Sequence, residues 1–178
     1  MSSQCLNCEF ILKLLDSCPT YQIDQFNDFP QATVWSQIMA YSSVAPFAIL
    51  PYFFFMIIYW NTYKAQRNMG LLLAIAIAMN ELLIKNLIKQ ERPVGACADS
   101  YGMPSSHAAI MAILFIYYIN QASTSGQYRN AFVVFFLGVM TCYSRIYLGY
   151  HSKEQVFAGL GYGTFISLLF DLFVDEVP

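Results

Sequence analysis

Long apolar stretches separated by short polar connections make up most of the chain after residue 33. Five stretches run from about Val34 to Trp60, Met69 to Ile88, Pro104 to Gln121, Ala131 to Tyr147 and Gln155 to Phe173. A stretch of about 18 or more residues with few charges is long enough to cross a bilayer as a helix. The pattern predicts an all-α, polytopic transmembrane helical bundle with about five spans. We expect residues 34–178 to form one membrane-embedded domain and residues 1–33 an N-terminal segment outside the membrane.

The composition agrees with a membrane environment and excludes some partners. Hydrophobic residues make up 57% of the chain and charged residues only 11%, unlike a soluble domain. A net charge of -2 argues against nucleic acid, which usually binds a clustered basic face. The cysteines are Cys5, Cys8, Cys18, Cys97 and Cys142. One Cys-x-x-Cys without a second pair does not predict a metal site, and the first three cysteines fit either a disulfide or free thiols.

Counting the crossings from the N-terminus predicts which connections share a side of the membrane. The end of the second span, the start of the third, the end of the fourth and the start of the fifth all fall on the N-terminal side. The polar residues with chemical potential gather at these four positions. We therefore expect one functional site at one face of the membrane.

Lys85 and Arg92 are seven residues apart at the end of the second span. If the helix continues to Pro93, both project from one face and can bind one anion. Each residue alone is equally well explained by a side chain that extends to lipid head groups. Glu81, four residues before Lys85, either orients that lysine or forms a buried pair with no catalytic part.

The segment MPSSH opens the third span. Pro104 fits the first helical position, and Ser105, Ser106 and His107 fill the first turn. Unpaired backbone N–H groups and the positive end of the helix dipole are suited to phosphate. In isolation, Ser105 is equally an ordinary helix cap and His107 an interfacial polar residue.

The segment SRIYLGYHSKEQ joins the fourth and fifth spans. Arg145 closes the fourth span, Gly149 permits a turn, and His151 precedes Gln155 by four residues. A side-chain carbonyl at Gln155 accepts the N–H of one ring nitrogen of His151 and leaves the other free to attack. Taken by themselves, a histidine and a glutamine at this spacing also commonly form an ordinary hydrogen bond at the membrane interface. The gathering of three cations and both histidines at one face favours the functional interpretation.

At this point the motifs resemble those of a known family. KNLIKQERP, MPSSH and SRIYLGYH are similar, in spacing and order, to the three signature motifs of the type 2 phosphatidic acid phosphatase superfamily, and with the helices between them they cover most of residues 68–175. The resemblance implies that His151 attacks phosphorus to form a phosphohistidine and that Gln155 orients its ring. It implies that His107 protonates the leaving group and then activates water. The implied phosphate-binding residues are Lys85, Arg92, Ser105, Ser106 and Arg145, and no metal or other cofactor is implied.

Two departures narrow the resemblance. Ser106 stands where the family usually has glycine, and Gln155 where it usually has aspartate. Both features are similar to dolichyl-diphosphatases of the endoplasmic reticulum. This similarity implies a membrane enzyme that converts dolichyl diphosphate to dolichyl phosphate and so recycles the carrier for protein N-glycosylation. A general lipid phosphate phosphatase remains the alternative within the superfamily, and a non-catalytic lipid-phosphate binding or transport protein the alternative outside it.

Orientation and assembly are less determined by the sequence. Apart from the three basic residues among the implied phosphate ligands, each side of the predicted bundle has three basic residues: Lys64, Arg67 and Arg129 on one, Lys13, Lys89 and Lys153 on the other. The positive-inside count is therefore a tie. A lumenal active site is implied by the resemblance alone, and no pattern indicates an oligomeric state.

Overall fold

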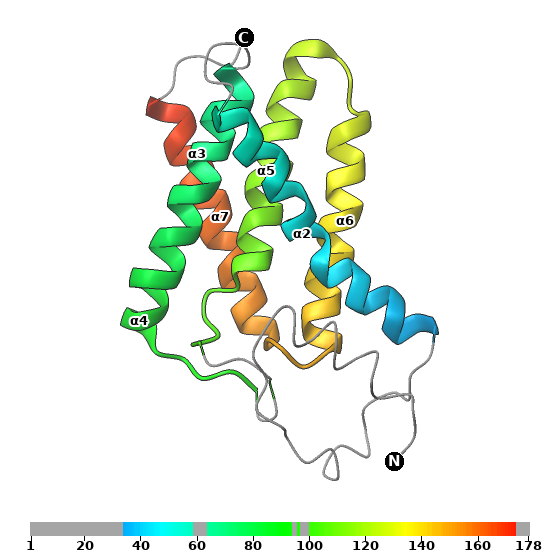
Figure 1. The fold of residues 1–178 in the computed structure, drawn as a ribbon, viewed down its shortest axis with the longest axis vertical. Helices are drawn as coiled ribbons and strands as arrows, with labels where there is room; N and C mark the ends of the chain where they lie inside the picture. Colours follow the sequence, from blue (N-terminus) through cyan, green and yellow to red (C-terminus); the bar gives the residue numbers. More distant parts are fainter. Residues whose placement is uncertain (1–33, 59–63, 94–95, 97–99, 174–178) are drawn as a thin grey trace.

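A computed structural model describes the following residues: 34–58, 64–93, 96 and 100–173 (Figure 1). Within these ranges all regular secondary structure is helical, which confirms the predicted all-α class. The helices are α2 (Val34–Ile58), α3 (Lys64–Met79), the π-helical turn η2 (Asn80–Ile84), α4 (Lys85–Ile88), α5 (Ser106–Ser125), α6 (Arg129–Tyr147) and α7 (Lys153–Phe173). The predicted N-terminal segment 1–33, with Cys5, Cys8 and Cys18, and also Cys97, lie outside the described residues.

The predicted spans correspond in order to α2, the continuous α3–η2–α4 stretch, α5, α6 and α7. Among the described residues, four helical stretches are long and apolar enough to cross a membrane: Lys64–Ile88, Ser106–Ser125, Arg129–Tyr147 and Lys153–Leu172. Helix α2 contains a shorter apolar stretch, Ile38–Tyr52, with Pro46 and Pro51 inside it. Proline is tolerated in membrane helices because neighbouring helices satisfy the freed backbone groups.

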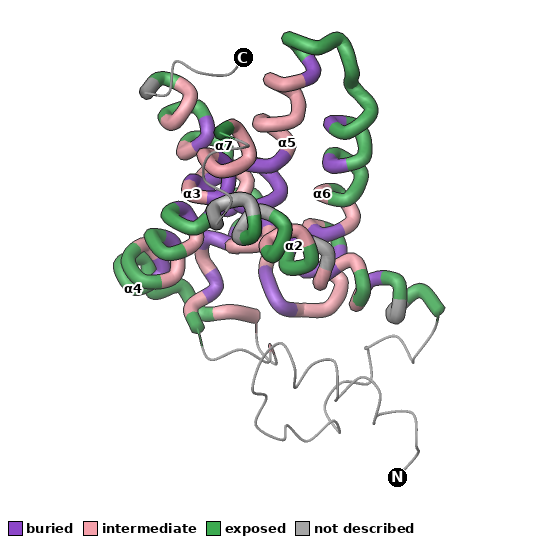
Figure 2. Tube along the Cα trace, turned by 45° about the horizontal axis from the view of Figure 1, so that its top comes forward, coloured by how far each residue is buried: buried purple, intermediate pink, exposed green. Residues whose placement is uncertain are grey.

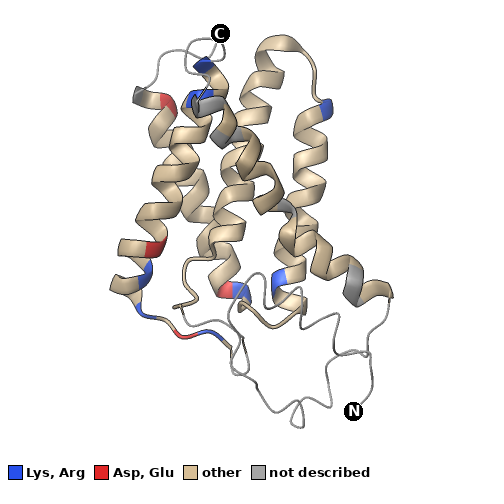
Figure 3. Ribbon diagram, viewed as in Figure 1, with Lys and Arg blue, Asp and Glu red and all other residues tan. Residues whose placement is uncertain are grey.

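The helices run alternately in opposite directions, as the crossing count predicted (Figure 1). The end of α4, the start of α5, the end of α6 and the start of α7 lie together at the lower end of the bundle in this view. Figure 3, a ribbon coloured by residue type, shows charged residues toward the two ends of the bundle and few between them. The elements that carry the three sequence motifs are therefore neighbours in space.

Helix α5 lies in the middle of the bundle and packs most closely against α7. A side chain at Gly159 of α7 would place its Cβ 2.4 Å from the backbone oxygen of Ser105, and one at Gly163 would lie 2.4 Å from the backbone oxygen of Ala109. Small residues let membrane helices approach to backbone contact. This contact places the first turn of α5 directly beside the first turn of α7.

The packing is that of a bundle surrounded by lipid. Leu73 of α3 and Ile113 and Leu114 of α5 are almost fully buried and form part of a continuous apolar core. Large apolar side chains also cover the outside, where Leu87 is 81% and Leu172 76% exposed, and Figure 2 shows exposed positions along the outer faces of the helices. Because an exposed apolar surface of this extent requires a partner, the surrounding hydrocarbon of a membrane accounts for it.

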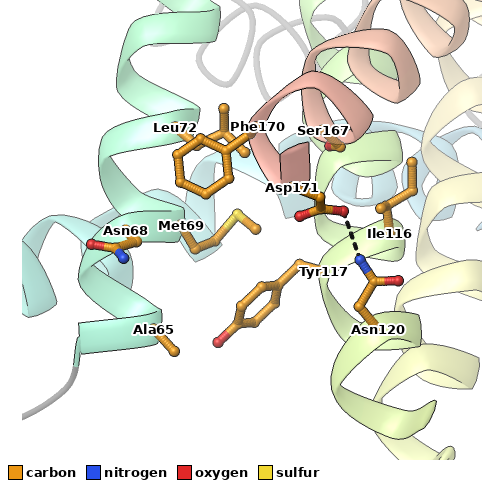
Figure 4. Close-up of a pocket in the computed structure, with 10 residues that line it drawn as sticks. All are labelled: Ala65, Asn68, Met69, Leu72, Ile116, Tyr117, Asn120, Ser167, Phe170 and Asp171. Atoms are coloured by element: carbon orange, nitrogen blue, oxygen red, sulfur yellow. Dashed lines mark hydrogen bonds between the residues drawn. The ribbon is translucent and has the colours of Figure 1, made fainter. Parts of the chain in front are cut away.

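A small hollow lies at the end of the bundle away from the sequence motifs. It is lined by α3, α5 and α7 and includes Tyr117, Ser167 and Phe170 (Figure 4). Asn120 Nδ2 donates a hydrogen bond of 2.8 Å to Asp171 Oδ2 at its edge. Neither histidine lines it. This end of the molecule therefore supplies control positions for tests of the other end.

Candidate active site

His151 is buried in the short connection between α6 and α7. Its Nδ1 lies 3.2 Å from Gln155 Oε1, and the backbone N–H of Ser152 donates to the same oxygen at 3.2 Å. Gln155 Nε2 donates to the carbonyl oxygen of Glu91 at 2.7 Å. Because the amide nitrogen faces a carbonyl, the amide oxygen must accept from the ring. Nδ1 therefore carries the proton and Nε2 keeps its lone pair, the arrangement that a nitrogen nucleophile needs.

Arg92 lies next to that lone pair. Its Nη1 is 3.3 Å from His151 Nε2 and donates to the carbonyl oxygen of Tyr150 at 3.2 Å. Its Nε and Nη2 donate to the backbone and side-chain oxygens of Ser100, each at 2.9 Å. These bonds fix a planar donor group beside the ring nitrogen, and such a group matches the oxygens of a phosphoryl group.

The expectation that a continuous helix carries Arg92 to the site is wrong. The second span does not continue to Pro93 as a helix, because α4 ends at Ile88 and Lys89 adopts a left-handed conformation with φ 52°. Arg92 reaches the site through the loop that follows, held by its bonds to Ser100 and Tyr150. The structure nevertheless brings it to the site that the sequence predicted.

Arg145 is buried at the end of α6. Its Nη1 donates to Ser43 Oγ of α2 at 2.6 Å, and its guanidinium lies 4.1 Å above the centre of the Tyr150 ring. Its carbonyl oxygen accepts the backbone N–H groups of Tyr150 and His151, at 3.0 and 3.1 Å. Gly149, with φ 72°, makes the turn between them. The residue that supplies the charge therefore also positions the backbone of His151.

The start of α5 supplies backbone donors. The helix begins at Ser106, with Ser105 as its N-cap, so the expectation that Pro104 takes the first helical position is wrong. The Ser105 N–H donates to the carbonyl oxygen of Gln155 at 3.0 Å. Ser105 Oγ is buried and has no hydrogen-bond partner among the described residues, so the side chain does not cap the helix. The free N–H groups of this first turn are suited to an anion.

His107 occupies the first turn of α5. Its ring packs edge-on against Phe47 of α2, with the ring centres 4.8 Å apart. It lies within electrostatic range of Arg145, His151 and Arg92. The structure thus brings both histidines and two of the predicted cations into one cluster.

Lys85 and Ser106 meet at Glu81. The Lys85 ammonium is buried and lies 2.7 Å from Glu81 Oε1. The Ser106 hydroxyl donates to the same carboxylate oxygen. The single proton of this hydroxyl is directed to Glu81, and the binding of phosphate by Ser106 stays a prediction. Lys85 remains close enough for its charge to act on His151.

The electrostatics of the site favour a neutral nucleophile. Burial, followed by the positive charges of Arg92 and Arg145, lowers the pKa of His151 from the usual 6.5 to about 3, although the bond to Gln155 acts in the opposite direction. A neutral imidazole at physiological pH keeps the Nε2 lone pair available. The same positive charges favour a negatively charged ligand in front of it.

Some residues of the site were not predicted from the sequence. Tyr150 stacks on Arg145 and accepts from Arg92, and Ser43 binds Arg145 from a helix 102 positions away. Asn80, which interrupts an apolar run, donates to the Ser106 hydroxyl at 2.7 Å. A buried amide in a membrane span was the one available signal, since such residues are costly and usually have partners.

Comparison with known proteins identifies the class. Residues 67–177 match the PAP2 superfamily, and the chain belongs to that superfamily. A PAP2-type phosphatidylglycerolphosphate phosphatase from Bacillus subtilis has the same fold, with a TM-score of 0.66, 15% identity, and coverage of 99% of this chain and 89% of that chain. The protein is thus a membrane phosphatase whose motifs and fold agree.

Three curated relatives narrow the comparison within this class. The dolichyldiphosphatase of Saccharomyces cerevisiae is 30% identical, over 89% of this chain and 70% of the relative. Dolichyldiphosphatase 1 of Homo sapiens is 29% identical, over 84% and 69%. Lipid phosphate phosphatase gamma of Arabidopsis thaliana is 35% identical over a shorter region, 59% of this chain and 51% of the relative.

Proposed function

We propose that the protein hydrolyses dolichyl diphosphate to dolichyl phosphate and inorganic phosphate through a phosphohistidine at His151. The observation that carries this proposal is the directed chain of hydrogen bonds from Gln155 through the His151 ring to Arg92. It leaves a lone pair on Nε2 beside a group that binds phosphoryl oxygens. An incoming phosphoryl group offers Arg92 charged oxygens in place of the ring nitrogen.

In the first step, the Nε2 lone pair of His151 attacks the terminal phosphorus, and the bond from that phosphorus to the bridging oxygen breaks. Dolichyl phosphate leaves with the bridging oxygen, which His107 protonates. The phosphoryl oxygens are held by Lys85, Arg92, Arg145 and the free backbone N–H groups in the first turn of α5. Gln155 keeps Nδ1 in place while the ring becomes cationic.

In the second step, His107, now neutral, takes a proton from water. The water oxygen attacks the same phosphorus, and the N–P bond breaks with its electron pair returning to His151 Nε2. Inorganic phosphate is released and both histidines return to their starting states. The chain's own cations stabilise the transferring charge in both steps, and the scheme assigns no step to a metal or cofactor.

The choice of dolichyl diphosphate is supported by the names of the relatives and by Ser106 and Gln155, the two departures from the usual motif. A general lipid phosphate phosphatase is the second candidate, supported by the likeness to lipid phosphate phosphatase gamma. A non-catalytic binding or transport protein is the third, and it needs no covalent intermediate. We further propose a location in the endoplasmic reticulum membrane with a lumenal active site, where the product serves N-glycosylation.

The substrate is tested with purified protein on dolichyl diphosphate, phosphatidate and a soluble sugar phosphate, with His151→Asn as the inactive control. The proposal predicts the highest kcat/KM on dolichyl diphosphate. An equal or higher value on phosphatidate favours the general phosphatase, and no turnover of any substrate contradicts an enzyme.

A protease-sensitive tag near Thr124, between α5 and α6, tests orientation in sealed microsomes. Cleavage from outside is expected, and protection of the tag contradicts a lumenal site.

A further inference from the structure

A chain of polar groups joins η2 to the start of α5, beside the residues that take part in the reaction steps. Asn80 Nδ2 donates to the carbonyl oxygen of Pro104 at 3.2 Å and to Ser106 Oγ at 2.7 Å. The Ser106 hydroxyl donates to Glu81, and Lys85 Nζ donates to the same oxygen at 2.7 Å. The Ser106 hydroxyl and the Lys85 ammonium therefore both donate to the Glu81 carboxylate, while Asn80 binds the Ser106 oxygen and the Pro104 carbonyl.

The π-helical turn makes this arrangement possible. The backbone N–H of Lys85 bonds to the carbonyl oxygen of Asn80, five residues earlier, in place of the usual four. A single turn of this kind inside a longer helix is rare and frequently occurs at a functional site. Asn80 is fully buried and faces α5, while Lys85 is also buried on the inner side of the bundle. Asn80, one residue before Glu81, and Lys85, four residues after it, are thus both on the inner side of the helix.

The bonding of Lys85 and Ser106 has a direct chemical consequence. A lysine ammonium has three donors on a long flexible side chain. Glu81 takes one of these donors and leaves two for a ligand. The Ser106 hydroxyl has one proton, which it donates in a hydrogen bond to Glu81. Ser106 therefore connects the anion-binding end of α5 to the carboxylate that holds the lysine.

We propose that Glu81 and Ser106 are positioning residues that hold the Lys85 ammonium in register with the backbone donors of α5, so that both act on the same terminal phosphate. The inference rests on the proposed function, because it assigns Lys85 and α5 to phosphate binding. It gives serine at position 106, where the superfamily usually has glycine, a specific role. A glycine there has no hydroxyl to reach Glu81.

The first test measures kcat/KM on dolichyl diphosphate and the inhibition constant of inorganic phosphate for Ser106→Ala and Ser106→Thr. We expect Ser106→Ala to lower kcat/KM roughly tenfold and to weaken phosphate inhibition by a similar factor, because small displacements of binding groups are costly in catalysis. Ser106→Thr, which keeps the hydroxyl, should stay within about threefold of the wild type. Ser123→Ala, the same change at the far end of α5, is the matched control and should have no effect.

The second test combines Ser106→Ala with Glu81→Met, which keeps a similar volume and removes the acceptor. Groups that act as one unit are not additive. The double variant should therefore lie within about threefold of Glu81→Met alone. If Glu81→Met does not fold, Lys85→Met replaces it, because without the ammonium the loss of the Ser106 hydroxyl should have no further effect. Thermal midpoints in detergent accompany each measurement.

The outcomes separate this inference from the proposed function. Losses that multiply in the double variant overturn the coupling. Unchanged phosphate inhibition in Ser106→Ala, with only a lower thermal midpoint, also overturns it, because the hydroxyl is then needed for stability alone. In both cases wild-type turnover that depends on His151 leaves the proposed function intact. If the wild type shows no turnover that depends on His151, both proposals fail together.

Discussion

The role of Gln155 leads to the most specific prediction. Gln155→Glu keeps the size and shape of the side chain but replaces the neutral amide by a carboxylate 3.2 Å from His151 Nδ1. An opposite charge at this range favours the protonated ring and raises the pKa of His151 from about 3 by roughly one to three units. In the wild type the Gln155 amide N–H donates to the Glu91 carbonyl oxygen. In the variant a carboxylate oxygen faces that carbonyl without a proton to share, which costs roughly 1–3 kcal/mol of stability.

The assay is kcat/KM of wild type and variant on the same substrate between about pH 4.5 and 8. Taking the ratio of the two removes the ionisation of the substrate. With a pKa of about 3, the wild-type ring is about 99% neutral at pH 5, whereas a ring with a pKa of about 5 is only half neutral. The ratio of variant to wild type should therefore fall as the pH is lowered. A ratio that stays constant across this range refutes the assignment of His151 as the group that must be neutral. Asp171→Asn, a change of charge far from the site, is the control and should give a ratio that does not depend on pH.

Three further predictions concern packing, proton transfer and stability. Gly159→Val places a side chain against the Ser105 backbone oxygen and should cost about 1–3 kcal/mol of stability, with a lower thermal midpoint in detergent and lower activity. Gly161→Val, whose added Cβ meets nothing within 4 Å, should change neither the thermal midpoint nor the activity. His107→Ala should lower kcat by roughly 10² to 10⁴, and an unchanged kcat contradicts its role in proton transfer. Below pH 6.5 the unfolded chain takes up a proton at His151 that the folded chain does not, so the wild type should lose roughly 2 kcal/mol of stability from this group by pH 5. His151→Asn should lack this part of the acid sensitivity in thermal melts.

The spans and the end of the bundle at which the motifs gather were predictable from the sequence. Bilayer thickness fixes the length of a spanning helix, so the apolar runs indicate where the helices lie. The number of crossings then determines which connections are neighbours. The pairing of His151 with Gln155 was also predicted from their spacing of four residues, although His151 lies in the connection before α7 and reaches Gln155 from outside the helix.

The remaining details depend on contacts between residues far apart in the chain. Pro104 was expected inside the third helix, but Asn80 binds its carbonyl oxygen and Gln155 binds the N–H of Ser105, so the helix begins only after Ser105, whose backbone is extended. Ser106 was predicted to bind phosphate, but nothing in the sequence indicated that its hydroxyl also has a partner in Glu81, 25 residues earlier. Local spacing contains no information about such partners, which only the packing of η2 against α5 provides.

The covalent intermediate tests the central claim most directly. Dolichyl diphosphate labelled in its terminal phosphate is mixed with purified protein and quenched during turnover, and the labelled peptide is mapped. The account predicts an acid-labile, base-stable phosphoenzyme with the label on His151, absent from His151→Asn and retained by Gly161→Val. Turnover without a labelled protein, or a label on a peptide without His151, would contradict it.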